Sequence, residues 1–267
     1  RGDRQSTRGI TPVMPAQLTV LLRAAAVAVA TLVSAAAATG SALAIGVSPL
    51  VVEANEANSG TDSRFVADNA DATPVPVEVV VSRIKLGLNG EITEIPGGAD
   101  DLLILPPQAL LQPGQSQAFR VQYVGPAMTE SQSYFVSVNQ VPVDTGDTGV
   151  QLVYNFRVLV NVAPLQGAPD LSFVQTEVTN VGGKSRPALT VRNAGLRHAL
   201  ISQMTALTIK QVDASGKTVY EEKLTGGRLN DVFGIGLVSP RSDRRFVLPI
   251  DLPQPGGRIE LEVEDAG

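Results

Sequence analysis

Residues 150–164 read VQLVYNFRVLVNVAP. Apolar residues occupy every second position from Val150 to Val162, and Pro164 ends the run. Alternation with period two, together with β-branched and aromatic residues, is typical of a β-strand, because alternate side chains of a strand point to the same face. A proline cannot donate a backbone hydrogen bond and is a natural end for such a run. The stretch therefore predicts a long strand over Val150–Val162.

Similar runs, broken by Gly, Pro, Asn and Asp, recur through the first half of the chain. Six of them precede the stretch above: Val47–Glu53, Arg64–Asn69, Val75–Ile84, Leu102–Leu105, Gln117–Tyr123 and Ser133–Val141. Seven short strands within about 120 residues favour a β-sandwich. No long segment after the first 44 residues has helical periodicity, which argues against a parallel α/β sheet with crossover helices.

The segment 164–170 contains Pro164, Gly167 and Pro169 and is predicted to be a linker. A second strand pattern follows it: Leu171–Thr179, Ala188–Asn193, Ser202–Gln211, Thr218–Leu224, Phe246–Ile250 and Arg258–Glu264, with a hairpin turn at 213–216. We therefore expect a first domain over 45–163, a linker over 164–170 and a smaller sandwich domain over 171–267.

The first 44 residues are predicted to be upstream residues and a signal peptide. Arg23 precedes an apolar run from Ala24 to Ala38, and the triplet ALA at 42–44 matches a small-x-small cleavage site. A membrane anchor is the alternative, but the run is about 15 residues and a span usually needs about 20. We expect export to the periplasm, a mature chain beginning near Ile45 and no integral membrane segment in it.

Composition narrows the function classes. The 267 residues include no Cys and one His, His198, which excludes disulfides and Cys-ligated zinc and leaves little for His-based catalysis. We expect no catalytic residues, no metal, no cofactor and no enzyme activity, with His198 a loop or strand-edge residue. The net charge of −5 argues against a nucleic-acid partner.

The remaining motifs have plain structural interpretations. The Gly-Gly pairs at 97–98, 182–183, 226–227 and 256–257 are interpreted as turns, because no strand-to-helix setting for a phosphate loop is evident around them. The acidic pairs at 100–101 and 221–222 are interpreted as solvated charge. The basic segment Arg241–Arg245 is placed in a turn, with an anion site as the alternative.

Four further stretches carry a family resemblance: LLILPPQALLQPG at 102–114, YFVSVNQVP at 134–142, RNAGLRHA at 192–199 and LVSPRS at 237–242. Together with residues 150–164 and in this order, they resemble the PapD-like periplasmic chaperones of chaperone–usher pilus and fimbria assembly, including their archaic branch. The resemblance covers most of residues 47–253.

The resemblance implies an all-β chain of two immunoglobulin-like β-sandwich domains at an angle, after a cleaved signal peptide. It implies a periplasmic chaperone that caps pilus or fimbrial subunits by donating a β-strand and delivers them to an outer-membrane usher. Val150, Leu152 and Tyr154 are the predicted donor residues, with ordinary core as the alternative. A secreted structural or adhesive protein with immunoglobulin-like domains is the alternative function.

Chaperones of this family hold the carboxylate of the subunit with two basic residues. In this chain the corresponding positions fall on Leu159 and near Pro49, and neither is basic. Arg157 lies two residues before Leu159, on the same predicted face, and is the favoured substitute. Arg120 and Arg83 are the further candidates. An ordinary solvated strand residue is the alternative interpretation of Arg157.

Overall fold

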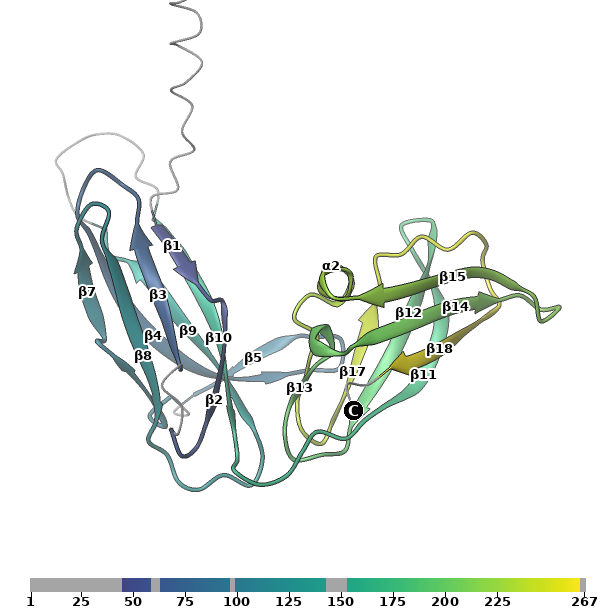
Figure 1. The fold of residues 1–267 in the computed structure, drawn as a ribbon, viewed down its shortest axis with the longest axis horizontal. Coiled ribbons are helices and arrows are strands. Elements are labelled where there is room, and N and C mark those ends of the chain that lie inside the picture. Colours follow the sequence, from purple (N-terminus) through teal and green to yellow (C-terminus); the bar gives the residue numbers. More distant parts are fainter. Residues whose placement is uncertain (1–44, 59–62, 97–98, 143–152, 265–267) are drawn as a thin grey trace, which may run out of the picture. The chain divides into compact units, whose positions relative to one another are not determined.

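The computed structural model describes residues 45–58, 63–96, 99–142 and 153–264. Within these ranges most residues lie in strands, and the other regular elements are one short α-helix and one 3₁₀ turn (Figure 1). The predicted fold class is confirmed: the chain is all-β and contains two immunoglobulin-like sandwiches. No helix in the described part of the chain is long and apolar enough to cross a bilayer.

The first sandwich consists of a four-stranded and a six-stranded sheet (Figure 1). The smaller sheet has the order β1 (Ile45–Ser48), β3 (Arg64–Asn69), β8 (Ser116–Tyr123), β6 (Leu102–Leu105). The larger sheet has the order β2 (Val51–Asn55), β10 (Asn155–Ala163), β9 (Gln132–Gln140), β4 (Val75–Leu86), β5 (Ile92–Ile95), with β7 (Gln108–Leu111) also paired to β4. Alternate residues of both sheets meet in one apolar core, in which the rings of Phe65 and Phe119 stack 5.2 Å apart.

The first predicted strand is wrong as a single element. The run 47–53 is divided between β1, which pairs antiparallel with β3, and β2, which pairs parallel with β10. The chain changes sheet at Ser48–Pro49, a cis peptide bond. Both halves carry the strand pattern, because Val47 and Val52 are each buried in the same core. Periodicity records this burial, and it contains no information on which sheet each half joins.

The second sandwich has its own core, formed by sheets of three, two and three strands. Their orders are β11 (Leu171–Val181), β12 (Lys184–Asn193), β17 (Ser242–Val247); β13 (Ala199–Leu200), β16 (Leu237–Val238); and β15 (Thr218–Thr225), β14 (Ala206–Val212), β18 (Arg258–Glu264). The predicted hairpin turn is confirmed: β14 pairs antiparallel with β15 around Gly216, whose φ of +86° favours glycine.

Three predictions in this half are wrong, in whole or in part. The pair Gly226-Gly227 does not simply form a turn, because strand β15 leads through it into the helix α2 (Gly227–Phe233). The segment Arg241–Arg245 is not a turn either, because β17 begins at Ser242. In β17, Arg244 and Arg245 pair with residues of β12 in the middle of the sheet. Their charged side chains concealed the strand from a pattern based on hydrophobicity. A 3₁₀ turn, Ile201–Gln203, also replaces the beginning of the predicted strand 202–211.

Residues 164–170 contain no strand. The carboxylate of Glu56, which follows β2, accepts hydrogen bonds from the backbone N–H of Leu165 and of Met128, each 2.7 Å long. These two bonds, the Leu165 bond first, lower the pKa of Glu56 from its usual range. The domain boundaries at 163 and 171 stay a prediction, and the residues before Ile45 lie outside the described part of the chain.

Candidate functional site

Strand β10 is paired along both edges for only part of its length. It pairs antiparallel with β9 from Asn155 to Val162. On the other edge it pairs in parallel with β2, from Leu159 to Ala163. Among the described residues, none pairs with the second edge of the segment 155–158. This segment therefore has an open backbone edge, which is a place where another strand can add to the sheet.

The direction of the backbone groups can be read from two hydrogen bonds. The Gln140 N–H donates to the Tyr154 carbonyl, so residue 154 directs its backbone groups toward β9. The Leu159 N–H donates to the Leu50 carbonyl, so residue 159 directs them toward the opposite edge. Because this direction alternates along a strand, Asn155 and Arg157 also face the open edge. Their N–H and C=O groups are available there for an incoming strand.

The predicted donor residues lie on or beside this segment. Tyr154 directly precedes β10, is half-buried, and stacks on Phe156 with ring centroids 6.3 Å apart. Phe156 packs against the core of the first sandwich, next to the fully buried Val158 along the strand face. Tyr154 thus extends the apolar face of β10 toward its open end. Val150 and Leu152 lie outside the described residues, so their role stays a prediction.

Arg157 lies on the other face of β10, together with Leu159. Its guanidinium carbon lies 5.4 Å from the centroid of the Phe135 ring, an aromatic residue of β9 that is the cross-strand neighbour of Leu159. A cation over an aromatic ring is attracted by the electrons of its face, and this holds the exposed arginine in place. The face shared with Leu159 is the one we expected from the residue spacing.

Arg120 and Arg83 are not brought to this face. Arg120 lies in β8, in the other sheet of the sandwich, and is exposed beside buried Phe119 and Val121. Arg83 alternates with Ile84 in β4 and shares the face of Val81, which packs against the core. Burial raises the pKa of the Tyr134 hydroxyl, and the nearby Arg83 charge opposes this shift only in part. The three predicted arginines therefore do not form one cluster.

Leu159 is buried because the second sandwich covers it. It forms an apolar cluster with Ile84 from the same sheet and with Leu200 and Leu237 from the second sandwich. A basic side chain here would have its charge buried against apolar groups at high cost. This environment favours a leucine at this position.

An apolar groove of about 230 Å³ adjoins this cluster. Its lining comes from both sandwiches: Ile84, Leu86, Ile92, Phe135, Leu159, Phe233, Ile235, Gly236, Leu237 and Arg244. Arg157 borders it through its contact with Phe135. The groove therefore combines apolar walls with the Arg244 guanidinium of the second sandwich, and Arg157 lies over one of its lining rings.

Arg244 is the charged residue of this groove, and the sequence analysis considered it only as part of the basic segment 241–245. Its guanidinium lies 5.1 Å from the Phe246 ring centroid, and its Nε is buried with no hydrogen-bond partner among the described residues. Burial lowers the pKa of this guanidinium, and the Glu91 carboxylate opposes the shift. The three arginines within residues 241–245 indicated a basic site in the sequence. Because the segment was predicted to be a turn, the position of Arg244 in the groove was not expected.

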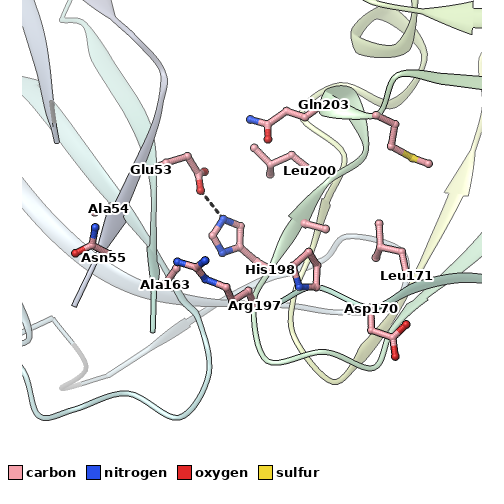
Figure 2. A pocket seen from close by; sticks show the side chains of 13 residues that line it. Glu53, Ala54, Asn55, Ala163, Asp170, Leu171, Arg197, His198, Leu200 and Gln203 are labelled. Carbon is pink, nitrogen blue, oxygen red and sulfur yellow. Dashed lines mark hydrogen bonds and ion pairs between the residues drawn. The ribbon is translucent and has the colours of Figure 1, made fainter. Parts of the chain in front are cut away.

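His198 is also more deeply placed than expected. It lies immediately before β13, it is buried, and its ring contacts Glu53 of β2 (Figure 2). The other ring nitrogen contacts Ser131, which precedes β9. It borders a second pocket of about 820 Å³. Over the ranges that the structure describes, no three or more His, Cys, Asp or Glu side chains gather as a metal site.

No protein-family model matches the chain, and no curated protein sequence matches it significantly. Solved structures similar to this chain are fimbrial chaperones. The class 5 fimbrial chaperone CfaA is 15% identical over 82% of this chain and 99% of its own, with a TM-score of 0.49. The Escherichia coli chaperone DraB is 16% identical over 77% and 84%, with a TM-score of 0.43.

Another similar chain comes from the CsuC–CsuE chaperone–tip adhesin complex of the archaic Csu pili of Acinetobacter baumannii. It is 12% identical, covers 76% of this chain and 89% of its own, and has a TM-score of 0.44. The likeness to fimbrial chaperones at these identities is one of fold. The roles of Tyr154, Arg157 and their neighbours therefore depend on the geometry of this chain.

Proposed function

We propose that the protein is a periplasmic chaperone that caps pilus or fimbrial subunits by donating β10 and delivers them to an outer-membrane usher, and that it is not an enzyme. The observation that carries the proposal is the open edge of β10 at residues 155–158, where no described residue pairs with the backbone groups along one side. An edge of this kind is a liability in an isolated protein and a binding device in a chaperone.

The chemistry of the client follows from the same geometry. A subunit that lacks one strand has an apolar groove and unpaired backbone groups on both sides of it. Strand β10 supplies backbone donors and acceptors from Asn155 and Arg157 and, on its core-side face, the ring of Tyr154. Val150 and Leu152 are proposed to continue this apolar face. Each buried apolar side chain would contribute about 1.5–3 kcal/mol to binding.

Arg157 is proposed to hold a carboxylate of the subunit. It lies over the ring of Phe135, which lines the groove, and Arg244 is another residue of that lining. A charge-assisted hydrogen bond contributes about 1.5–3 kcal/mol where water is excluded. Arg120 and Arg83 lie away from this face, and we do not propose them as anchors.

Co-expression with a pilus subunit encoded beside an usher in the same genome tests the proposal. We expect the subunit to be soluble and to co-purify in a one-to-one complex only when the chain is present. A peptide with the sequence of the subunit's missing strand should displace the chain from the complex. A chain that binds a glycan or a cell surface by itself, and leaves the subunit insoluble, would instead support the adhesive alternative.

A further inference from the structure

The larger pocket, of about 820 Å³, lies beside the segment that joins the two sandwiches (Figure 2). Its lining comes from the end of β2, from the residues Pro169, Asp170 and Leu171, and from residues between Arg197 and Met204. Sites for small ligands are concave, enclose about 300–1,000 Å³ and often lie where two domains meet. The size and the place of this pocket therefore fit a small ligand.

Two side chains of opposite charge, Arg197 and Asp170, line the pocket. Arg197 is half-buried and Asp170 is exposed. Within the part of the chain that the structure describes, neither side chain takes part in an ion pair or a hydrogen bond. Figure 2 shows the guanidinium and the carboxylate apart from each other. The pocket therefore offers a cationic group and an anionic group that are separate and free to bind a ligand.

One buried amide fixes the backbone of both charged residues. Asn193, the last residue of β12, is 0% exposed. Its Oδ1 accepts a 3.0 Å hydrogen bond from the backbone N–H of Asp170. Its Nδ2 donates a 2.7 Å hydrogen bond to the backbone carbonyl of Arg197. Because both ends of the amide are bonded, the two backbone segments have a fixed separation, and the charged side chains take no part in holding them.

Gly195 allows these two segments to approach each other. The backbone N–H of Leu196 donates to the carbonyl of Ala168 over 3.1 Å. A Cβ added at Gly195 would lie 2.2 Å from that carbonyl oxygen and 2.6 Å from the backbone nitrogen of Asp170. Any other residue would force the segments apart. The placement of Asp170 beside the turn 193–197 is thus built into the second sandwich.

The other walls of the pocket are largely apolar. They include the side chains of Ala54, Ala163, Leu171, Leu200 and Met204. The Glu53 carboxylate and the His198 ring also line it, but these two groups already contact each other. A ligand that fits this pocket therefore has an apolar part between two opposite charges.

We propose that the pocket binds a short peptide with free ends. Arg197 binds the terminal carboxylate, Asp170 binds the terminal ammonium group, and an apolar side chain packs on Leu171, Leu200 and Met204. An extended chain of two or three residues spans about 7–10 Å, which separates its end charges as the pocket requires. A free amino acid carries both charges on one carbon atom. The inference goes beyond the capture of a pilus subunit and does not depend on it.

Titration of the ¹⁵N-labelled protein with the tripeptide Ala-Leu-Ala tests the proposal through the amide chemical shifts. We expect shift changes around residues 168–171 and 196–204, with saturation at a single site. The amino-acetylated peptide lacks the ammonium group, and the carboxy-amidated peptide lacks the carboxylate. Each should bind about 10-fold more weakly or worse, because each loses a charge-assisted hydrogen bond.

Two substitutions assign the charges. In Arg197→Gln the amidated and the unblocked peptide should bind equally, and in Asp170→Asn the acetylated and the unblocked peptide should bind equally. Both variants keep the backbone hydrogen bonds to Asn193, so both should fold. Arg192→Gln is the matched control, since Arg192 is an exposed arginine of β12 that does not line the pocket. It should keep the preference for both free ends.

Four results would overturn the proposal. One is the absence of shift changes at millimolar peptide, and another is shift changes that fall elsewhere in the chain. Equal binding of the blocked and unblocked peptides to the unmodified protein would show that the charged ends are not recognised. A preference for free ends that survives both Arg197→Gln and Asp170→Asn would show that other groups bind them.

Discussion

The guanidinium of Arg157 lies over the ring of Phe135, 5.4 Å from its centroid, on the side of the six-stranded sheet where Leu159 is covered by the second sandwich. The charge is thus held at the border of an apolar groove and not inside it. Its neighbour Leu159 is enclosed, and Arg157, two residues earlier, is exposed. The proposed anchor, Arg157, therefore lies two residues before the enclosed Leu159 and on the same face of the strand.

Arg157→Ala should weaken the complex with a subunit by about 10- to 150-fold, which corresponds to the loss of about 1.5–3 kcal/mol in a charge-assisted contact. The unfolding free energy should fall by no more than about 1 kcal/mol, because an exposed cation–π contact contributes little. Titration calorimetry and thermal unfolding measure the two effects. Arg120→Ala, on the other sheet, is the control and should leave binding unchanged. Equal effects of both substitutions would argue against Arg157 as the anchor.

Asn155→Pro should abolish strand donation and leave the sandwich folded. Residue 155 begins β10 and directs its N–H to the open edge, so a proline there removes a donor that β9 does not use. Phe156→Pro removes an N–H that faces β9 and should unfold the strand. Asn155→Ala controls for the side-chain bond to Asn139. Recovery of soluble subunit, with circular dichroism of each variant, is the measurement. Full recovery with Asn155→Pro would place the donating edge elsewhere.

Tyr154→Ser should reduce the affinity for the subunit by about 10- to 150-fold, since burial of one such side chain contributes about 1.5–3 kcal/mol. The stack of Tyr154 on Phe156 accounts for a smaller loss of stability, about 0.5–1.5 kcal/mol. Competition with a labelled subunit gives the affinity. Val153 is the exposed neighbour, so Val153→Ser should have little effect on the affinity. A larger loss of affinity with Val153→Ser than with Tyr154→Ser would mean that the strand face is assigned wrongly.

The adjacent residues Leu110 and Leu111 test the sandwich core. Leu111 is 0% exposed and Leu110 is 55% exposed, although both lie in β7. Leu111→Ala should lower the unfolding free energy by about 2–5 kcal/mol through lost burial and a cavity. Leu110→Ala should change it by less than about 0.5 kcal/mol. Urea unfolding of both variants measures the difference, and similar values would contradict the assigned faces of β7.

Export should yield a chain that begins near Ile45. The apolar run 24–38 and the triplet ALA at 42–44 predict cleavage there, immediately before strand β1. Amino-terminal sequencing of the protein from a periplasmic extract checks this. An uncleaved chain that remains with the membrane fraction would show that the segment is an anchor.

The sequence alone determined the fold class and the face of the proposed site. Alternation from Val150 to Val162 indicated a strand and put Arg157 on the face of Leu159, because side-chain direction has a strict period of two in any strand. The hairpin around Gly216 was equally local. The charged first part of β17, residues 242–245, was missed as a strand and α2 as a helix, because their backbone conformation depends on neighbouring strands and on the core more than on residue pattern.

The tertiary structure decided the open edge, the groove and the buried contact between His198 and Glu53. Pairing with β2 begins only at Leu159, so residues 155–158 have one partner strand within the described part of the chain, and no sequence pattern records where a neighbouring strand begins. Arg244 enters the groove, and His198 meets Glu53, 145 positions away in the chain. Contacts between residues so distant are set by the packing of two sandwiches, since period and composition describe only which face of an element is buried.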